Sequence, residues 1–167
     1  MEPYGTTGQL GSVGIWYGMI DSLPTPQARE AARLVEHLGY GALWVAEAVG
    51  RDPFVSAALL LDATDRLAVA TGIANIYARD PMAMLAGQRT LAEAFRDRFL
   101  LGMGVSHGHL VAGIRKHDYS RPYSYMVDYL ERMDSALYMA VSAEDDPGRV
   151  LAALGPKMLE IAGGSTA

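Results

Sequence analysis

The chain has 167 residues, of which half are hydrophobic, a formal net charge of −5 and no cysteine. This length supports one sizeable core rather than two domains, the acidic balance without a Lys/Arg-rich run provides no face for phosphate backbones, and the lack of cysteine excludes a disulfide scaffold and any thiolate site. The start has no signal-peptide pattern, and no apolar run approaches the roughly 18 residues of a membrane span. We therefore expect a single-domain cytoplasmic protein that binds neither nucleic acid nor membranes.

The first expected unit is a strand followed by a helix. Residues 13–17 (VGIWY) form a short apolar and aromatic run that is typical of a strand. The prolines at positions 24 and 26 end this extended segment and open a helix, with Thr25 as its cap. Apolar residues then recur at three- and four-residue steps as far as Leu38, and Gly39 is the residue type that helix C-termini favour.

A second unit of the same kind follows at once. Residues 42–46 (ALWVA) predict a buried strand and residues 47–51 a loop. Asp52 can cap a helix whose first position suits Pro53, and the apolar run then continues to about Leu61. The chain therefore repeats the order of strand, loop and capped helix.

The third unit contains the most informative stretch of the chain. The apolar run of residues 67–71 is of strand type and breaks at Gly72 into a loop that ends in Asp80 and Pro81. Asp80 is expected to cap a helix over residues 81–94. Loops of this kind, at the end of a buried parallel strand, are where barrel enzymes keep their chemistry.

Two further strands are expected in the second half of the chain. Residues 99–102 form the fourth strand, and the polar segment over 106–122 that follows is long enough to favour a functional role. Helical spacing resumes over 123–141, residues 150–154 form a fifth strand, and 157–162 form a last helix. The first four strands start 25 to 32 residues apart, which is the length of a βα unit and implies parallel strands covered by helices.

Two folds use this pattern, a doubly wound open sheet and a (β/α)8 barrel. A doubly wound sheet is complete with about five strands, so the length of the chain favours it, since a barrel typically needs about 250 residues. Its nucleotide-binding fingerprint is absent, however. The first strand–helix junction has no glycine-rich loop, and the late Gly102-Met103-Gly104 has His107 where the third glycine belongs.

Four segments carry motifs that occur in this order in a known family: VGIW (13–16), GALWVAEA (41–48), ATGIANIYARDP (70–81) and RFLLGMGVSH (98–107). Together they resemble the luciferase-like monooxygenase superfamily, closest to its coenzyme F420-dependent oxidoreductase branch. The resemblance implies an α/β fold of the (β/α)8 TIM-barrel type, here truncated to about five βα units. It also implies a deazaflavin or flavin at the C-terminal ends of the strands, and hydride transfer between that ring and an organic substrate.

The resemblance sets the expected domain boundaries. A partial luciferase-like barrel is expected over residues 13–162, between a flexible leader (1–12) and a short tail (163–167). A complete member of the family continues through three more βα units, which normally finish the cofactor pocket. An open five-unit barrel leaves two unpaired edge strands and exposes apolar faces. We therefore expect the chain to pair with another chain as a homo-oligomer or, failing that, to bind cofactor poorly.

The resemblance also assigns the residues around the cofactor. In the family, a backbone bulge with a non-prolyl cis peptide after the third strand presses on one face of the isoalloxazine ring, and Gly72-Ile73 is the matching position. Residue types alone would favour an ordinary turn there. Trp44, on the second strand, is expected in the core. The expected cofactor-binding residues are Trp16, Gly72, Ile73, Ala74, Asn75, Gly104 and His107.

His107 and Glu47 are the expected catalytic residues. In the resembling enzymes an acidic side chain often stands where His107 falls, so His107 is expected to transfer a proton near the ring. Glu47 would contribute a carboxylate at the barrel mouth, although a solvated or helix-capping role fits this residue equally well. His107 and His109 form an HxH pair without a third ligand at recognisable spacing, so no metal is expected. Arg79 is expected to pair with surface carboxylates rather than with an anionic ligand.

The expected function is hydride transfer between coenzyme F420 and a small organic molecule. One departure from the family is Ala48, at a position where several deazaflavin enzymes place a histidine, because alanine can neither donate nor accept a proton. The alternative cofactor is FMN, which can also activate oxygen and would make the protein a monooxygenase. A second alternative is a truncated, non-catalytic half-barrel that associates with another chain.

Overall fold

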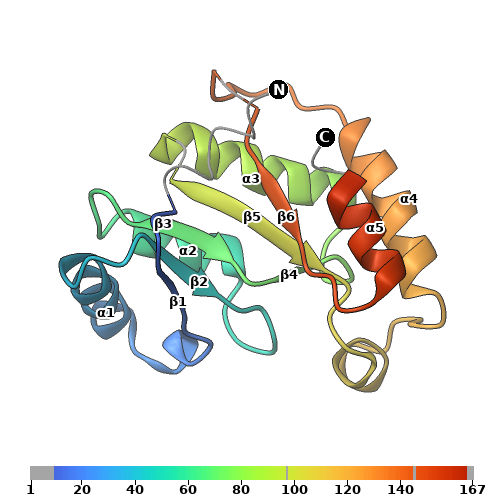
Figure 1. Ribbon diagram of the computed structural model, residues 1–167, viewed down its shortest axis with the longest axis horizontal. Helices are drawn as coiled ribbons and strands as arrows, with labels where there is room; N and C mark the ends of the chain where they lie inside the picture. Colours follow the sequence, from blue (N-terminus) through green and yellow to red (C-terminus); the bar gives the residue numbers. More distant parts are fainter. Residues whose placement is uncertain (1–9, 97, 145, 165–167) are drawn as a thin grey trace.

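The computed structural model describes residues 10–96, 98–144 and 146–164, and strands and helices alternate along them (Figure 1). The strands are β1 (Gly14–Trp16), β2 (Ala42–Val45), β3 (Ala68–Thr71), β4 (Ala74–Asn75), β5 (Phe99–Gly104) and β6 (Arg149–Leu151). The helices are α1 (Thr25–His37), α2 (Pro53–Leu61), α3 (Pro81–Phe95), α4 (Pro122–Asp134) and α5 (Pro156–Gly164). A 3-10 turn (Ile20–Ser22) follows β1, and a π-helical segment (His109–Ile114) follows β5.

The strands are parallel, and their order in the sheet follows the chain. β1 pairs with β2 and β2 with β3, while β5 pairs with β3 on one side and with β6 on the other; the two-residue β4 also pairs with β5. A doubly wound sheet reverses its strand order at a switch point, and the described sheet contains no reversal. Its five βα units are wound in one direction, as in a (β/α)8 barrel. The predicted fold class is confirmed, and the doubly wound alternative is wrong.

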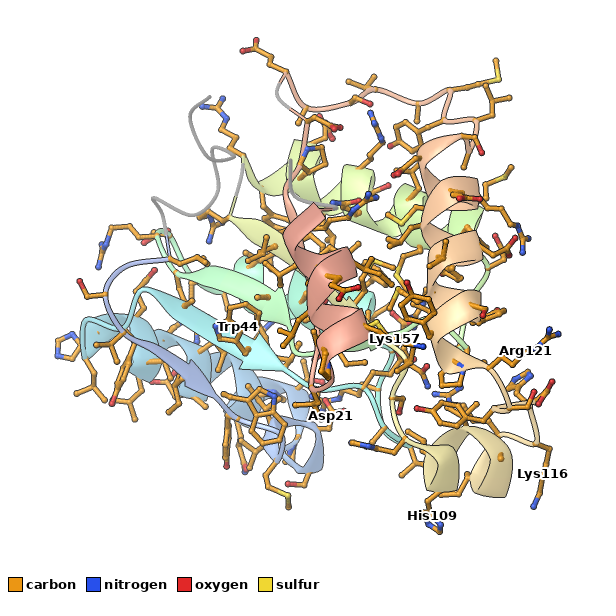
Figure 2. All side chains as sticks on the ribbon, turned by 45° about the vertical axis from the view of Figure 1, so that its right-hand side comes forward. Asp21, Trp44, His109, Lys116, Arg121 and Lys157 are labelled. Carbon is orange, nitrogen blue, oxygen red and sulfur yellow. The ribbon has the colours of Figure 1, made fainter. Side chains whose placement is uncertain are left out.

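The two faces of the sheet have different surroundings. Leu43, Val45 and Leu101 belong to the buried core beneath the helices, where α2 packs on β3 and α3 on β5. Side chains alternate along a strand, so Trp44 lies on the opposite face (Figure 2). There its half-buried indole lies close to Gly14, on which an added Cβ would be 3.2 Å from the indole nitrogen. This second face would be the inside of a closed barrel.

Helix starts follow the prediction where a local side chain sets them. Asp52 accepts two backbone hydrogen bonds from the first turn of α2, and Asp80 accepts one from the first turn of α3, so both predicted caps are confirmed. The predicted cap at Thr25 is wrong. Thr25 is the first helical residue, and Pro24 holds the cap position without a side-chain hydrogen bond.

The prediction is less accurate after β5. α4 ends at Asp134 rather than at residue 141, and at this end the carbonyl of Glu131 accepts both the backbone N–H and the hydroxyl of Ser135. The apolar spacing beyond this point does not mark a packed face, since Leu137 is 69% exposed. β6 covers three residues instead of the five predicted over 150–154.

The ends of the described chain add two observations. α5 reaches Gly164, so two residues of the predicted tail are helical. The rest of that tail (165–167) and most of the predicted leader (1–9) lie outside the described residues. None of the helices in the described ranges is long and apolar enough to cross a membrane.

Candidate functional site

The candidate site lies at the carboxyl ends of the strands. The loops that follow β1, β2 and β5 gather along the lower edge of the sheet in Figure 1. The loop after β1 is joined to the loop after β2 by Asp21, whose carboxylate accepts a hydrogen bond from the backbone N–H of Arg51 at 3.2 Å. The loops after β3 and β5 are joined to the loop after β2 by Glu47, which is described below. Four βα loops therefore meet in one place.

A bulge interrupts the sheet at the end of β3. Ala70 is in register with Leu100, and the next pair is Ala74 with Met103, so one extra residue lies on the side of β3. The Gly72–Ile73 peptide within this bulge is cis, which confirms the conformation that the family resemblance predicts. The bulge therefore places two successive residues where a regular strand would place one.

Thr71 and Gly102 replace the missing strand pairing beside the bulge. The Thr71 hydroxyl donates to the Gly102 carbonyl at 2.7 Å and accepts from the Gly102 N–H at 2.9 Å. A Cβ on Gly102 would lie only 1.9 Å from the Thr71 carbonyl oxygen, so no side chain fits at this position. The absence of a side chain on Gly102 lets the two backbones approach each other.

Trp16, Gly72, Ile73 and Gly104 form the surface around the bulge. The Trp16 indole N–H donates to the Gly72 carbonyl at 2.7 Å, and Trp16 remains 61% exposed. A Cβ on Gly104 would lie 3.3 Å from Cγ1 of Ile73, so Gly104 leaves the Ile73 side chain just enough room. Of the predicted cofactor residues, these four are brought together on the inner side of the sheet.

Ala74 and Asn75 lie directly behind this surface and are fully buried. The Asn75 side-chain oxygen accepts from the N–H of Tyr77 at 3.0 Å. Its buried amide nitrogen has no hydrogen-bond partner within the described residues. Because an unmet buried donor is costly, Asn75 is suited to donate to a bound acceptor.

Glu47 is the most connected charged residue of the site. Its side chain is 6% exposed and follows β2. One carboxylate oxygen accepts from the backbone N–H of Asn75 at 2.7 Å and from Arg79 at 2.8 Å; the other accepts from Arg79 at 2.8 Å and from Arg115 at 3.4 Å. Both oxygens are therefore engaged in hydrogen bonds within the protein.

Arg79 is buried in the same network. Only 11% of its side chain is exposed. The predicted pairing with a surface carboxylate is confirmed for Asp52, which is 48% exposed and lies at 3.2 Å, but the main partner of Arg79 is the buried Glu47. Burial disfavours the charged guanidinium, but the hydrogen bonds and charge of Glu47, followed by those of Asp52, outweigh burial and raise the pKa of Arg79 above its usual range. The Arg79 guanidinium therefore stays charged.

Four tyrosines pack the loop after β3 against α4. The rings of Tyr77 and Tyr125 are stacked with centroids 4.4 Å apart, and Tyr119 and Tyr129 flank them. The Tyr129 hydroxyl donates to the carbonyl of Arg79 at 2.9 Å. Burial raises the pKa of Tyr77 to about 12, so its phenol stays protonated near neutral pH. The cluster is therefore an aromatic support for the loop after β3.

The two histidines after β5 differ from this packed network. His107 is exposed at the start of the loop, where its carbonyl accepts the N–H of Val111 at 2.9 Å. His109 lies at the tip of the π-helical segment and points away from the sheet (Figure 2). Within the described ranges, no three His, Asp or Glu side chains are arranged to hold a metal ion. No hydrogen bond joins His107 to Glu47 among the described contacts, so the two predicted catalytic residues do not form a pair.

Sequence reasoning missed Arg115, Thr71 and the tyrosine cluster. Arg115 lies in the long polar segment over 106–122, but no local pattern connects it to a carboxylate 68 residues earlier. The tyrosines at positions 125 and 129 have helical spacing, which predicts a shared face without naming its partner.

The match to known families agrees with this geometry. The sequence profile described as luciferase-like monooxygenase covers residues 14–165. The chain belongs to this family. A provisionally named coenzyme F420-dependent oxidoreductase of Mycobacterium tuberculosis is 26% identical over 119 residues, which are 71% of this chain and 34% of that relative. The chain thus spans about a third of the length of this curated relative.

Solved structures show the same fold with different cofactors. An F420-dependent secondary alcohol dehydrogenase, in complex with an F420-acetone adduct, superposes with a TM-score of 0.80 at 14% identity, covering 90% of this chain and 55% of that one. The oxygenating constituent of 3,6-diketocamphane monooxygenase from Pseudomonas putida, in complex with FMN, superposes with a TM-score of 0.55 at 13% identity, covering 65% of this chain and 33% of that one. At these identities the likeness shows the fold alone.

Proposed function

We propose that this member of the family is an oxidoreductase that binds coenzyme F420 against the Gly72–Ile73 bulge and acts on a small organic molecule. The observation that carries the proposal is the surface made by Trp16, Ile73 and Gly104. It joins the exposed indole of Trp16 to the half-buried aliphatic side chain of Ile73, which packs beside the buried Gly104, and such an apolar surface suits a flat aromatic ring. The F420-dependent relatives supply the choice of cofactor.

The residues present fit such a ring. Trp16 and Ile73 would contact its faces or edge, and the unpartnered amide nitrogen of Asn75 would donate to one of its polar atoms. When bound, a deazaflavin supplies hydride transfer, whereas FMN also supplies reaction with oxygen. His107, exposed in the loop after β5, would transfer a proton beside the ring.

A specific observation keeps the FMN alternative open. The monooxygenase from Pseudomonas putida shares the fold and is in complex with FMN. The surface at the bulge would recognise a tricyclic ring by its flat shape. Coenzyme F420 and FMN both have such a ring. A non-catalytic half-barrel is the remaining alternative, supported by Ala48, which has no proton to exchange.

We further propose that the protein works in the cytoplasm as a homo-oligomer. The cysteine-free composition fits a reducing compartment. β1 and β6 each have a single strand partner within the described sheet, and both are therefore available for pairing with another chain.

Cofactor binding tests the proposal directly. Purified protein is titrated with coenzyme F420 and with FMN while the fluorescence of each cofactor is followed. We expect saturable binding that is tighter for F420. Trp16→Ala should weaken it about tenfold through loss of aromatic contact. Met19→Ala is the matched control, because Met19 is 64% exposed after the same strand. Saturation by neither cofactor would overturn the enzyme proposal, and tighter binding of FMN would replace it by the monooxygenase alternative.

A further inference from the structure

Two arginines from different loops, Arg79 and Arg115, donate hydrogen bonds to the Glu47 carboxylate. The two contacts differ in length and burial. Arg79 binds both carboxylate oxygens at 2.8 Å, and its side chain is 11% exposed. The backbone carbonyl of Arg79 also accepts a hydrogen bond from the Tyr129 hydroxyl. Arg115 reaches one oxygen at 3.4 Å and is 28% exposed. A two-pronged buried pair is rigid, whereas a single long contact near solvent is readily broken and re-formed.

Arg115 lies at the end of the π-helical segment that follows β5. The loop after β5 runs from the exposed His107 through the π-helical segment His109–Ile114. Val111, which is fully buried, anchors the first half of this loop. Tyr119 anchors the far end by packing on Tyr77. Arg115 adds the polar connection between these anchors, because it donates to Glu47 and to the carbonyl of Ala48 at 3.2 Å. π-helical turns are frequent at functional sites, where they direct individual side chains.

The same carboxylate holds the bulge. Glu47 accepts from the backbone N–H of Asn75, which follows the Gly72–Ile73 peptide, and Arg79 extends that hold to the end of the loop. One buried side chain therefore contacts the backbone beside the expected ring surface and, through Arg115, the segment that begins with His107. The guanidinium Nε of Arg115 is buried without a partner among the described residues, so this arginine is confined by its surroundings rather than fully satisfied.

We propose that Glu47 and Arg115 are positioning residues: Glu47 holds the bulge through Asn75 and Arg79, and Arg115 fixes the segment carrying His107 relative to that bulge. The Glu47–Arg79 contact stays formed, whereas the Glu47–Arg115 contact can break and re-form. The inference rests on the proposed function for its consequence in catalysis. Its structural part concerns the free protein and is measured without any cofactor.

Backbone hydrogen exchange of the free protein tests the structural part. Arg115→Ala should increase exchange over residues 107–117 by about tenfold, the change expected for the loss of a hydrogen bond to a charged group, and leave residues 74–80 unchanged. Arg115→Lys should recover part of the protection, because an ammonium supplies the charge but only a point contact. Arg121→Ala is the matched control, since Arg121 is exposed near the end of the same segment and projects away from the sheet (Figure 2).

Kinetics of the loaded enzyme test the catalytic part. Arg115→Ala should lower kcat by about tenfold with little change in cofactor affinity, because it displaces His107 and not the ring surface. Glu47→Gln should weaken cofactor binding as well, since it also loosens the bulge. Unchanged exchange in Arg115→Ala, or an equal increase across the whole sheet, would overturn the inference. Failure of the unaltered protein to bind either cofactor would defeat the proposed function, while the exchange result would still decide the positioning role.

Discussion

Gly102 shows how a single residue makes the site possible. The bulge removes regular pairing between β3 and β5, and the Thr71 hydroxyl restores it by bonding both backbone groups of Gly102. These two hydrogen bonds require a close approach of the Thr71 and Gly102 backbones, which only a residue without Cβ permits at position 102. At the residue scale, the surface at the bulge therefore depends on a hydroxyl and a glycine that lie 31 positions apart in the sequence.

Gly102→Ala should therefore destabilise the protein strongly. The added Cβ would lie 1.9 Å from the Thr71 carbonyl oxygen, which is backbone and cannot move aside cheaply. We expect a loss of at least about 2 kcal/mol in the free energy of unfolding. Urea unfolding followed by circular dichroism measures it. Gly155→Ala is the control, because a Cβ on Gly155 would meet no atom within 4 Å. Equal unfolding midpoints for the two variants would show that β5 accommodates a side chain there.

The connection between α1 and β3 depends on one carboxylate. Glu36 Oε1 accepts from three consecutive backbone N–H groups, those of Asp65, Arg66 and Leu67, at 3.1, 2.6 and 2.8 Å. Partial burial acts to raise the pKa of Glu36, but the three amide hydrogen bonds and the nearby Arg66 charge outweigh it and lower the pKa below its ordinary value of 4.5. The folded state therefore favours the charged carboxylate.

Glu36→Gln should lower the stability of the protein by an amount that depends on pH. A pKa that is depressed on folding contributes stability above the unfolded value and loses it as the pH falls through the folded value. At pH 7 we expect Glu36→Gln to be less stable by about 1 kcal/mol, the scale of a partly exposed charged hydrogen bond. Below pH 4.5 the difference should shrink, because the carboxyl of the unfolded chain is then protonated, and it should be lost once the pH falls below the lowered pKa of the native carboxyl. Thermal unfolding from pH 3 to 7 measures it, with Glu30→Gln, on the outer face of α1, as the control. A difference that does not depend on pH would contradict the assignment.

At the element scale, the sequence predicts those helix starts and strands that depend on residues adjacent in the chain. Asp52 and Asp80 cap the helices that begin beside them, and apolar runs marked the five barrel strands. The end of α4 was mispredicted because Leu137 continues a helical pattern that no packing supports. The site was predicted in part: the family motif located the bulge, but the Glu47–Arg115 contact joins distant loops, and no local pattern encodes it.

At the scale of the whole molecule, the described sheet has two open edges. β1 pairs with β2 alone and β6 with β5 alone, while the chain matches about half the length of the F420-dependent alcohol dehydrogenase. Large apolar side chains lie near both edges: Val13 and Trp16 are 60% and 61% exposed, and Leu154 is 95% exposed. Unpaired strands flanked by exposed apolar residues favour association with further strands.

Self-association should therefore depend on the β1 edge. Sedimentation velocity over a range of concentrations should show species larger than the 17.9 kDa monomer. Val13→Lys should shift them towards the monomer, because a lysine at an edge strand opposes pairing with another chain. Val55→Lys is the matched control: Val55 is also 60% exposed but lies on α2, away from the edge. A monomer at every concentration, or an equal shift in both variants, would show that the edges do not drive assembly. If the β1 edge is used, dissociation by Val13→Lys should also weaken cofactor binding, since Trp16 lies on that same strand.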